Sequence, residues 1–150
     1  MYLRNICLIV AVCATCWSVP AHAQSTGSIV KFPNELEFKA PLSPGLPQTA
    51  VLYGDPTKAG VFVTRVKFAP GLKLMPHWHP DEVRTVVVLS GTLYFGLGEQ
   101  WDDSKLRAYP AGTFFSEPSK TAHYAWAKEG EVIIQVTGIG PTGTTPIPQK

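Results

Sequence analysis

The chain has 150 residues, enough for one domain, with a formal net charge of +2 and no block of like charges. So small and evenly spread a charge gives no electrostatic support for nucleic-acid binding, and the sequence predicts no nucleic-acid partner. Fourteen prolines and thirteen glycines, with many Val, Phe and Thr residues, favour a turn-rich all-β protein over a helical one.

The first 23 residues have the organisation of a secretory signal peptide. A short basic start over 1–4 precedes an apolar run over 5–19, which is too short to span a bilayer comfortably. Ala21-His22-Ala23 has the small-x-small pattern of a signal-peptidase site. We therefore expect cleavage after Ala23 and a single domain over 24–150; an uncleaved membrane anchor is the alternative.

The three cysteines, Cys7, Cys13 and Cys16, all lie in this leader. The mature chain would then contain none, which excludes disulfides and thiol chemistry. Attachment of a lipid at Cys16 is a second alternative, but the residues before it fit a lipoprotein signal poorly. We expect a periplasmic or secreted protein that has no membrane contact after cleavage.

Short apolar runs separated by turn residues follow along the chain. Residues 29–38 fit an edge strand, whereas 41–47 contains three prolines and fits an extended loop. The loop over 98–105 is polar, and the tail over 138–150 has little to pack. The expected strands cover 49–53, 61–68, 72–79, 83–89, 92–97, 106–109, 113–117, 122–127 and 131–137. No segment has sustained helical periodicity, so the pattern predicts a β-sandwich or barrel.

The first candidate site lies in 71–91. His77 and His79 are two residues apart, and in a strand such residues face the same side of the sheet. A strand can in this way present two imidazole nitrogens to one metal ion. The alternative is a partly exposed strand with two ordinary histidines. Gly71 stands six positions before His77, and Gly91 closes the stretch.

A second stretch, over 112–127, contains Gly112, Pro118 and His123 at similar regular spacings. Together the two stretches resemble the paired motifs of the cupin superfamily. The first cupin motif is Gly, five residues, His-x-His, three or four residues, Glu, six residues, Gly. The second is Gly, five residues, Pro-x-Gly, two residues, His, three residues, Asn. Lys120 replaces the second motif's internal glycine, and Ala127 replaces its asparagine.

The resemblance implies a jelly-roll β-barrel, or double-sheet sandwich. It also implies a metal site made by His77, His79 and His123. Three neutral imidazoles suit Zn, Fe, Ni or Cu, and they suit Mn less well without a carboxylate. The alternative is that these histidines only fill the barrel lumen.

Arg84 is the departure that bears on chemistry, because it replaces the glutamate that is often the fourth metal ligand in cupins. A bare guanidinium about 6 Å from a dication would be repelled by about 5 kcal/mol at an effective dielectric constant of 20. Arg84 could pair with Asp81 or Glu82, or Glu82 could enter the ligand position through a shifted register. Arg84 could instead hold an anionic substrate in bidentate fashion.

Gln135 is a lone polar residue in an apolar strand, so it either faces the cavity or faces solvent. We take Gln135 and Arg84 as the catalytic candidates. Tyr94 and Tyr109 are further candidates for lining the pocket, with ordinary sheet packing as the alternative for each. Trp101 lies in the polar loop, for which a surface position is favoured over a lid.

The combined prediction is an exported metal-binding cupin. Its first interpretation is a metal-dependent enzyme, such as an oxygenase, isomerase or lyase, that acts on a small organic molecule for which an anion is one option. The alternative is a non-catalytic periplasmic cupin that binds a small ligand or a metal. A structural barrel is a third hypothesis, and we expect a homodimer in each case.

Overall fold

The structure is a computed structural model that describes residues 27–41 and 43–149. Residues 31–150 form one compact unit. Of the other unit, residues 1–30, only 27–30 are described, and all four are exposed. The predicted leader, its three cysteines and its cleavage site therefore lie outside the described residues. Within the described residues, no helix combines the length and the apolar character needed to cross a membrane.

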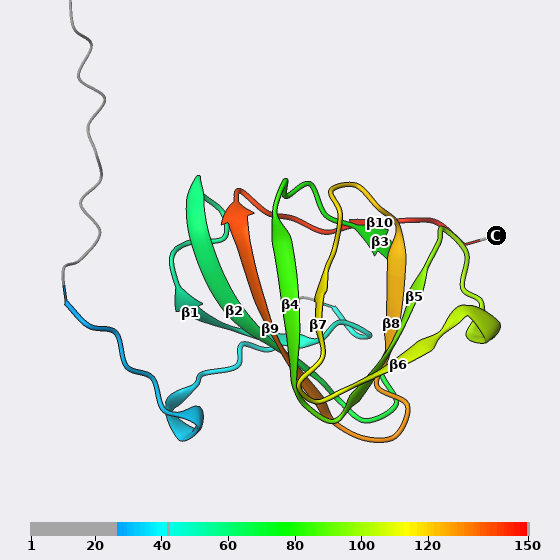
Figure 1. Ribbon diagram of the computed structural model, residues 1–150, viewed down its shortest axis with the longest axis horizontal. Helices are drawn as coiled ribbons and strands as arrows, with labels where there is room; N and C mark the ends of the chain where they lie inside the picture. The colour runs from blue at the N-terminus through cyan, green and yellow to red at the C-terminus, as the bar shows by residue number, and fades with distance from the viewer. Residues whose placement is uncertain (1–26, 42, 150) are drawn as a thin grey trace, which may run out of the picture. The chain divides into compact units, whose positions relative to one another are not determined.

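The fold consists of two five-stranded antiparallel sheets (Figure 1). One sheet has the strand order β1-β2-β9-β4-β7, and the other has the order β10-β3-β8-β5-β6. The strands of the first sheet are β1 (Gln48–Tyr53), β2 (Gly60–Phe68), β9 (Val132–Gly140), β4 (Arg84–Ser90) and β7 (Phe114–Ser116). The strands of the second are β10 (Thr145–Pro146), β3 (Lys73–Trp78), β8 (His123–Trp126), β5 (Thr92–Leu97) and β6 (Arg107–Pro110). This arrangement confirms the predicted all-β double-sheet fold.

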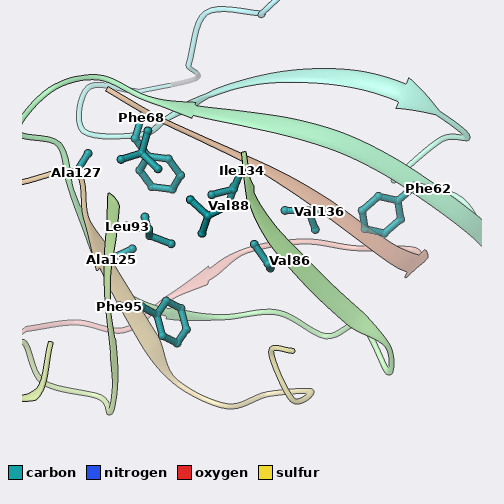
Figure 2. Close-up of a cluster of buried hydrophobic side chains, with 11 residues drawn as sticks. Phe62, Phe68, Val86, Val88, Leu93, Phe95, Ala125, Ala127, Ile134 and Val136 are labelled. Carbon is teal, nitrogen blue, oxygen red and sulfur yellow. The ribbon is translucent and has the colours of Figure 1, made fainter. Parts of the chain in front are cut away.

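The hydrophobic core lies between the two sheets (Figure 2). It follows from strand alternation, because every second residue of β9 is buried and, in β4, the buried Val86 and Val88 alternate with less buried neighbours. The buried apolar members of this cluster are Phe62, Phe68, Val86, Val88, Leu93, Phe95, Ala125, Ala127, Val132, Ile134 and Val136. Side chains from both sheets thus fill one layer, as in other β-sandwiches.

The segment before β1 differs from the prediction of an edge strand over 29–38. It contains a 3-10 turn, η1 (Pro33–Glu35), and forms an isolated bridge to β1 between Lys39 and Thr49. Proline has no amide hydrogen for a ladder and fits the first position of a helical turn. Glu35 caps the turn, because its Oε2 accepts from the Phe32 amide at 3.0 Å. The edge-strand prediction was wrong for these two local reasons.

The tail also differs from the prediction that it has little to pack. β9 runs on to Gly140, and β10 then pairs with β3. The Ile147 amide donates to the Pro76 carbonyl at 2.9 Å, and the Gln149 side chain donates to the Glu99 carbonyl at 3.0 Å. Proline and glycine in the sequence concealed a segment that is held mainly by backbone contacts.

The loop that contains Trp101 includes a second 3-10 turn, η2 (Asp103–Lys105). The loop lies against the outer face of the second sheet, because the rings of Trp101 and Tyr124 are 5.0 Å apart and the Tyr124 hydroxyl donates to the Asp102 carbonyl at 3.0 Å. Tyr124 alternates with the inward-facing His123 and Ala125 along β8. The loop is therefore on the surface side of the sheet and is not a lid over the core.

Candidate metal site

The three histidines of the two motifs come together on the inner face of the second sheet. His77 and His123 are direct partners in the β3–β8 ladder, and His79 follows the end of β3. The β3–β8 register shifts between Leu74 and His77, so that both remain on the inner face although they are three residues apart. The i, i+2 spacing then places His79 on the same face as His77.

The imidazoles form a compact buried cluster. The centroids of the His77 and His123 rings are 4.4 Å apart, and those of His79 lie 5.0 Å from His77 and 5.2 Å from His123. The nitrogen atoms that could bind a metal all lie within 4.8 Å of one another. The residues are only 3–8% exposed. Such a group can bind one metal ion from three sides.

The second nitrogen of each ring fixes its orientation. Nδ1 of His77 donates to the Met75 carbonyl at 2.7 Å, and Nδ1 of His123 donates to the Thr121 carbonyl at 2.9 Å. Nδ1 of His79 donates to the Gly143 carbonyl at 2.6 Å. A carbonyl can only accept, so each Nδ1 carries the hydrogen. In the neutral form of each ring the lone pair is then on Nε2, which is the form that a metal ion requires.

Burial keeps the imidazoles of His77 and His79 neutral. Burial, followed by the charge of His123, lowers the pKa of His77 from 6.5 to about 4. Burial, followed by the charge of Arg84, lowers the pKa of His79 from 6.5 to about 3. At neutral pH both imidazoles are therefore deprotonated and available as ligands without prior loss of a proton.

Glu117 is a buried acid beside this cluster, and the sequence analysis did not select it. Its Oε1 lies 3.7 Å from Nε2 of His123, and its Oε2 lies 3.9 Å from Nε2 of His79. Glu117 is 8% exposed. The missing carboxylate of the first motif, together with an acid next to Pro118 in the second, was the signal that could have found it.

Arg84 forms two ion pairs with buried acids. Its Nε donates to Oε2 of Glu117 at 2.5 Å, and its Nη1 donates to Oδ2 of Asp81 at 2.9 Å. Nη1 also lies 3.5 Å from the Thr142 hydroxyl. Of the options drawn from the sequence, pairing with Asp81 is the one that the structure contains. A guanidinium already shared by two carboxylates has little capacity left to clamp an anionic substrate.

Glu82 does not enter the ligand position. It is exposed and precedes β4, whose register with β9 is regular from Arg84 to Val88. The option of a shifted register was therefore wrong. Strand alternation explains why, since the regular pairing of the core valines in β4 leaves no extra residue before Arg84.

Gln135 lies on the outer face of the first sheet, away from the histidines. Its neighbours Ile134 and Val136 are buried in the core, and its ladder partners on either side are Arg65 and Val87, which are half-buried. The option that Gln135 faces the cavity was wrong, because alternation along an apolar strand does not reveal which face a single polar residue takes.

The two tyrosine candidates have different positions. Tyr94 is on the outer face, where its hydroxyl donates to Glu129. Tyr109 is on the inner face and stacks on Phe95 at 5.6 Å, and Phe115 completes this group at 4.9–5.0 Å from both rings. Phe95 in turn stacks on His123 at 5.4 Å. We call Phe95, Tyr109 and Phe115 the aromatic cluster; it makes one side of the histidine site apolar.

The distances between the two imidazole nitrogens and the carboxylate of Glu117 show whether these groups fit around one metal ion. Nε2 of His123 and Nε2 of His79 face the carboxylate oxygens of Glu117 at 3.7 and 3.9 Å. These distances are too long for hydrogen bonds. They resemble the separation of about 3–4 Å between two ligand atoms that are each about 2.0–2.2 Å from one ion. A metal ion between the carboxylate and the two imidazoles would fit these distances, with Arg84 on the other side of Oε2.

The double-sheet β fold, with a group of inward-facing histidines that could hold a metal ion, defines the class of small β-sandwich and β-barrel proteins with an internal candidate site. Residues 64–137 match the family model described as "Cupin domain". This match and the fold support the resemblance to the cupin superfamily.

Relatives and solved structures agree with this resemblance. Germin-like protein 5-1 from Oryza sativa subsp. japonica is 36% identical over 67 residues, which are 43% of this chain and 29% of that protein. The chain thus spans under a third of that relative. KdgF from Halomonas sp. has a TM-score of 0.58 at 23% identity, over 77% of this chain and 96% of the other. The polyketide cyclase RemF from Streptomyces resistomycificus has a TM-score of 0.67 at 14% identity, over 81% and 86%.

Proposed function

We propose that this protein is a metal-dependent enzyme that acts on a small organic molecule. The observation that carries the proposal is the arrangement of the three imidazoles, since each Nδ1 is tied to a backbone carbonyl and the ligand nitrogens of the three rings lie within 4.8 Å of one another. A divalent transition metal such as Zn, Fe, Ni, Cu or Mn would supply a Lewis acid there. Three protein nitrogens leave positions for water or substrate, as catalytic sites do.

The net charge of the site supports an acidic substrate, without direct binding of that substrate by Arg84. A dication, the carboxylates of Asp81 and Glu117 and the guanidinium of Arg84 sum to a net charge of about +1 when the histidines are neutral. A monoanion that binds at the open positions would cancel this charge. The aromatic cluster beside His123 would contact an apolar part of the same molecule.

The comparisons support a catalytic role without choosing the reaction. RemF is described as a polyketide cyclase, so this fold is compatible with an enzyme. Identity below 25% carries only the fold, and one fold can serve many reactions. The reaction class of this chain, whether oxygenase, isomerase or lyase, therefore depends on the metal and the substrate.

The test is metal analysis of the purified protein and of a His123→Ala variant, with Gln135→Ala as the matched control on the outer face. We expect about one equivalent of transition metal in the unmodified protein and in the control, and loss of that metal from His123→Ala. Absence of metal from the unmodified protein after incubation with each candidate ion would overturn the proposal. Metal without turnover on a panel of small acids would favour the non-catalytic binding protein instead.

We also propose that the protein is exported, with cleavage after Ala23. The support is the order of basic start, apolar run and Ala21-His22-Ala23 in the sequence. Mass spectrometry of the mature N-terminus in a periplasmic or culture fraction would test this. Homodimerisation stays a prediction, which analytical ultracentrifugation of the mature protein would check.

A further inference from the structure

We infer that Glu117 is the fourth protein ligand of the metal, supplied from the strand opposite the position where the cupin motif has its glutamate. The inference rests on the proposed metal site and deepens it. It assigns a function to an acid that the motif pattern does not include, and it gives Arg84 and Asp81 the role of positioning residues.

The first argument is the position of Glu117 in the sheet. β4 and β7 pair in register from Thr85 with Ser116 to Val87 with Phe114, which makes Arg84 and Glu117 the next facing pair. The Glu117 amide donates to the Arg84 carbonyl at 3.0 Å, which continues the ladder by one step. An acid at this position can reach the same inner space as an acid at position 84, because facing residues of two strands point to the same side.

The second argument is the position of Glu117 relative to two of the imidazoles. Its Oε1 lies 3.7 Å from Nε2 of His123 and its Oε2 lies 3.9 Å from Nε2 of His79, distances too long for hydrogen bonds. Arg84 donates to Oε2 from one side, but no hydrogen bond links the carboxylate to either imidazole on the other side. A metal ion bound to the carboxylate and both imidazoles would link them.

The third argument is the balance of charge. The repulsion expected between Arg84 and a dication is offset by Asp81, which is 2% exposed and pairs with Nη1 at 2.9 Å. Arg84 carries one positive charge and pairs with both carboxylates, so the group of Arg84, Asp81 and Glu117 retains one net negative charge for the metal. Three imidazoles and the carboxylate of Glu117 would then make the donor set that the cupin motif obtains with a glutamate at position 84.

This assignment changes the expected choice of metal. A carboxylate oxygen suits Mn(II), whereas imidazole nitrogens alone suit Zn, Ni and Cu better. Loss of Glu117 should therefore weaken binding of Mn(II) more than binding of Zn(II). A purely structural role for Glu117 would weaken both ions equally, because it would act only through the position of the histidines.

The experiment is titration calorimetry of the metal-free protein with Mn(II) and with Zn(II), in the unmodified protein, in Glu117→Gln and in Glu82→Gln. Glu82 is the matched control, since it is an exposed acid two residues from Arg84. We expect Glu117→Gln to lower Mn(II) affinity by more than the roughly 10–100-fold that loss of an outer contact causes. Zn(II) affinity should fall less, and Glu82→Gln should bind both ions normally. Equal affinities in Glu117→Gln and the unmodified protein would overturn the inference.

A second pair of variants separates a ligand from a mere partner of Arg84. Asp81→Asn/Arg84→Met removes the arginine together with its other acid, and the triple variant adds Glu117→Gln. If Glu117 is a ligand, the triple variant should bind Mn(II) more weakly than the double variant, even though neither variant contains the Arg84 guanidinium. Equal binding by the double and triple variants would overturn the assignment of Glu117. Failure of the unmodified protein to bind either ion would instead overturn the proposed function itself.

Discussion

His77 and His123 face each other across β3 and β8, and their ring centroids are 4.4 Å apart. Each is held by the carbonyl of the residue two positions before it, Met75 for His77 and Thr121 for His123. The same short-range contact therefore sets the ring orientation on both strands. Two of the three candidate ligands are in this sense prepared by their own local backbone.

The first prediction concerns the pH dependence of stability in the metal-free protein. The pKa values of His77 and His79 are about 4 and 3 in the folded chain, below the ordinary value of 6.5. Between the ordinary pKa of 6.5 and these lowered values, the unfolded chain binds more protons than the folded chain. The free energy of unfolding must therefore fall as the pH falls. We expect full stability above about pH 6.5 and a loss on the order of a few kcal/mol by about pH 4.

Urea unfolding of the metal-free protein at pH 7.5, 6 and 5 would measure this effect. A variant with both His77 and His79 replaced by Gln removes the two groups and should flatten the curve over this range. If the curve of the unmodified protein is flat from pH 7.5 to 5, these histidines are not held neutral by the fold.

The second prediction concerns Arg84→Met. This variant leaves Asp81 and Glu117 buried without the guanidinium that pairs with both. Breaking a buried pair from one side costs about 3–5 kcal/mol, so we expect a loss of this size in the metal-free protein. Saturating Mn(II) should recover part of it, because the ion supplies positive charge to Glu117.

Thermal unfolding with chelator and with Mn(II) would measure both values. Lys58→Met is the control, since Lys58 forms an exposed ion pair with Asp55 and should change stability by no more than about 1 kcal/mol. An equal loss with and without Mn(II) would mean that Arg84 acts on the fold alone.

The third prediction concerns Gly96, over which the Tyr124 ring packs on the outer face of the second sheet. A Cβ at position 96 would lie 2.5 Å from that ring. Gly96→Ala should therefore displace Tyr124 and lower the free energy of unfolding by about 1–3 kcal/mol. Gly130→Ala, where a Cβ has open space, is the control. Chemical unfolding of both variants measures the difference, and equal stability would contradict the packing described here.

The fold could be predicted because its signals are local. Turn residues bound each strand, and apolar alternation marks the buried face, so nine strands were expected close to where they are. The prediction of an edge strand before β1 was wrong because Pro33 and Glu35 favour a turn. β10 was missed because it consists of Thr145 and Pro146 alone and depends on its pairing with β3.

The site could be predicted only where its residues share a strand or a motif. The spacing of His77 and His79 predicts a shared face, and the second motif adds His123. The sequence offers only an indirect signal for Glu117, an acid next to Pro118, because its position opposite Arg84 depends on the register of β4 and β7, which the sequence alone does not fix. The prediction that Gln135 faces the cavity failed for a related reason: a period of two residues does not show which face of the strand is inside.

The fourth prediction concerns the segment after β9. Deletion of 142–150 removes the Gly143 carbonyl that accepts from Nδ1 of His79. Loss of such an outer partner typically costs 10–100-fold in metal affinity, and we expect a decrease of about this size. Gln149→Ala is the control, because it removes a tail contact to Glu99 but leaves Gly143 in place. Metal titration of the three proteins gives the answer, and normal affinity in the deletion would mean that His79 needs no such partner.

The contact between His79 and Gly143 spans 64 positions, whereas those of His77 and His123 span two. Two rings thus keep their orientation for as long as their own strands persist, and the third depends on a segment attached through the short strand β10. A brief detachment of that segment would free one ring to turn while both sheets stay intact. The rate of metal exchange would then be set by this local opening, and an ion could be replaced without global unfolding of the protein.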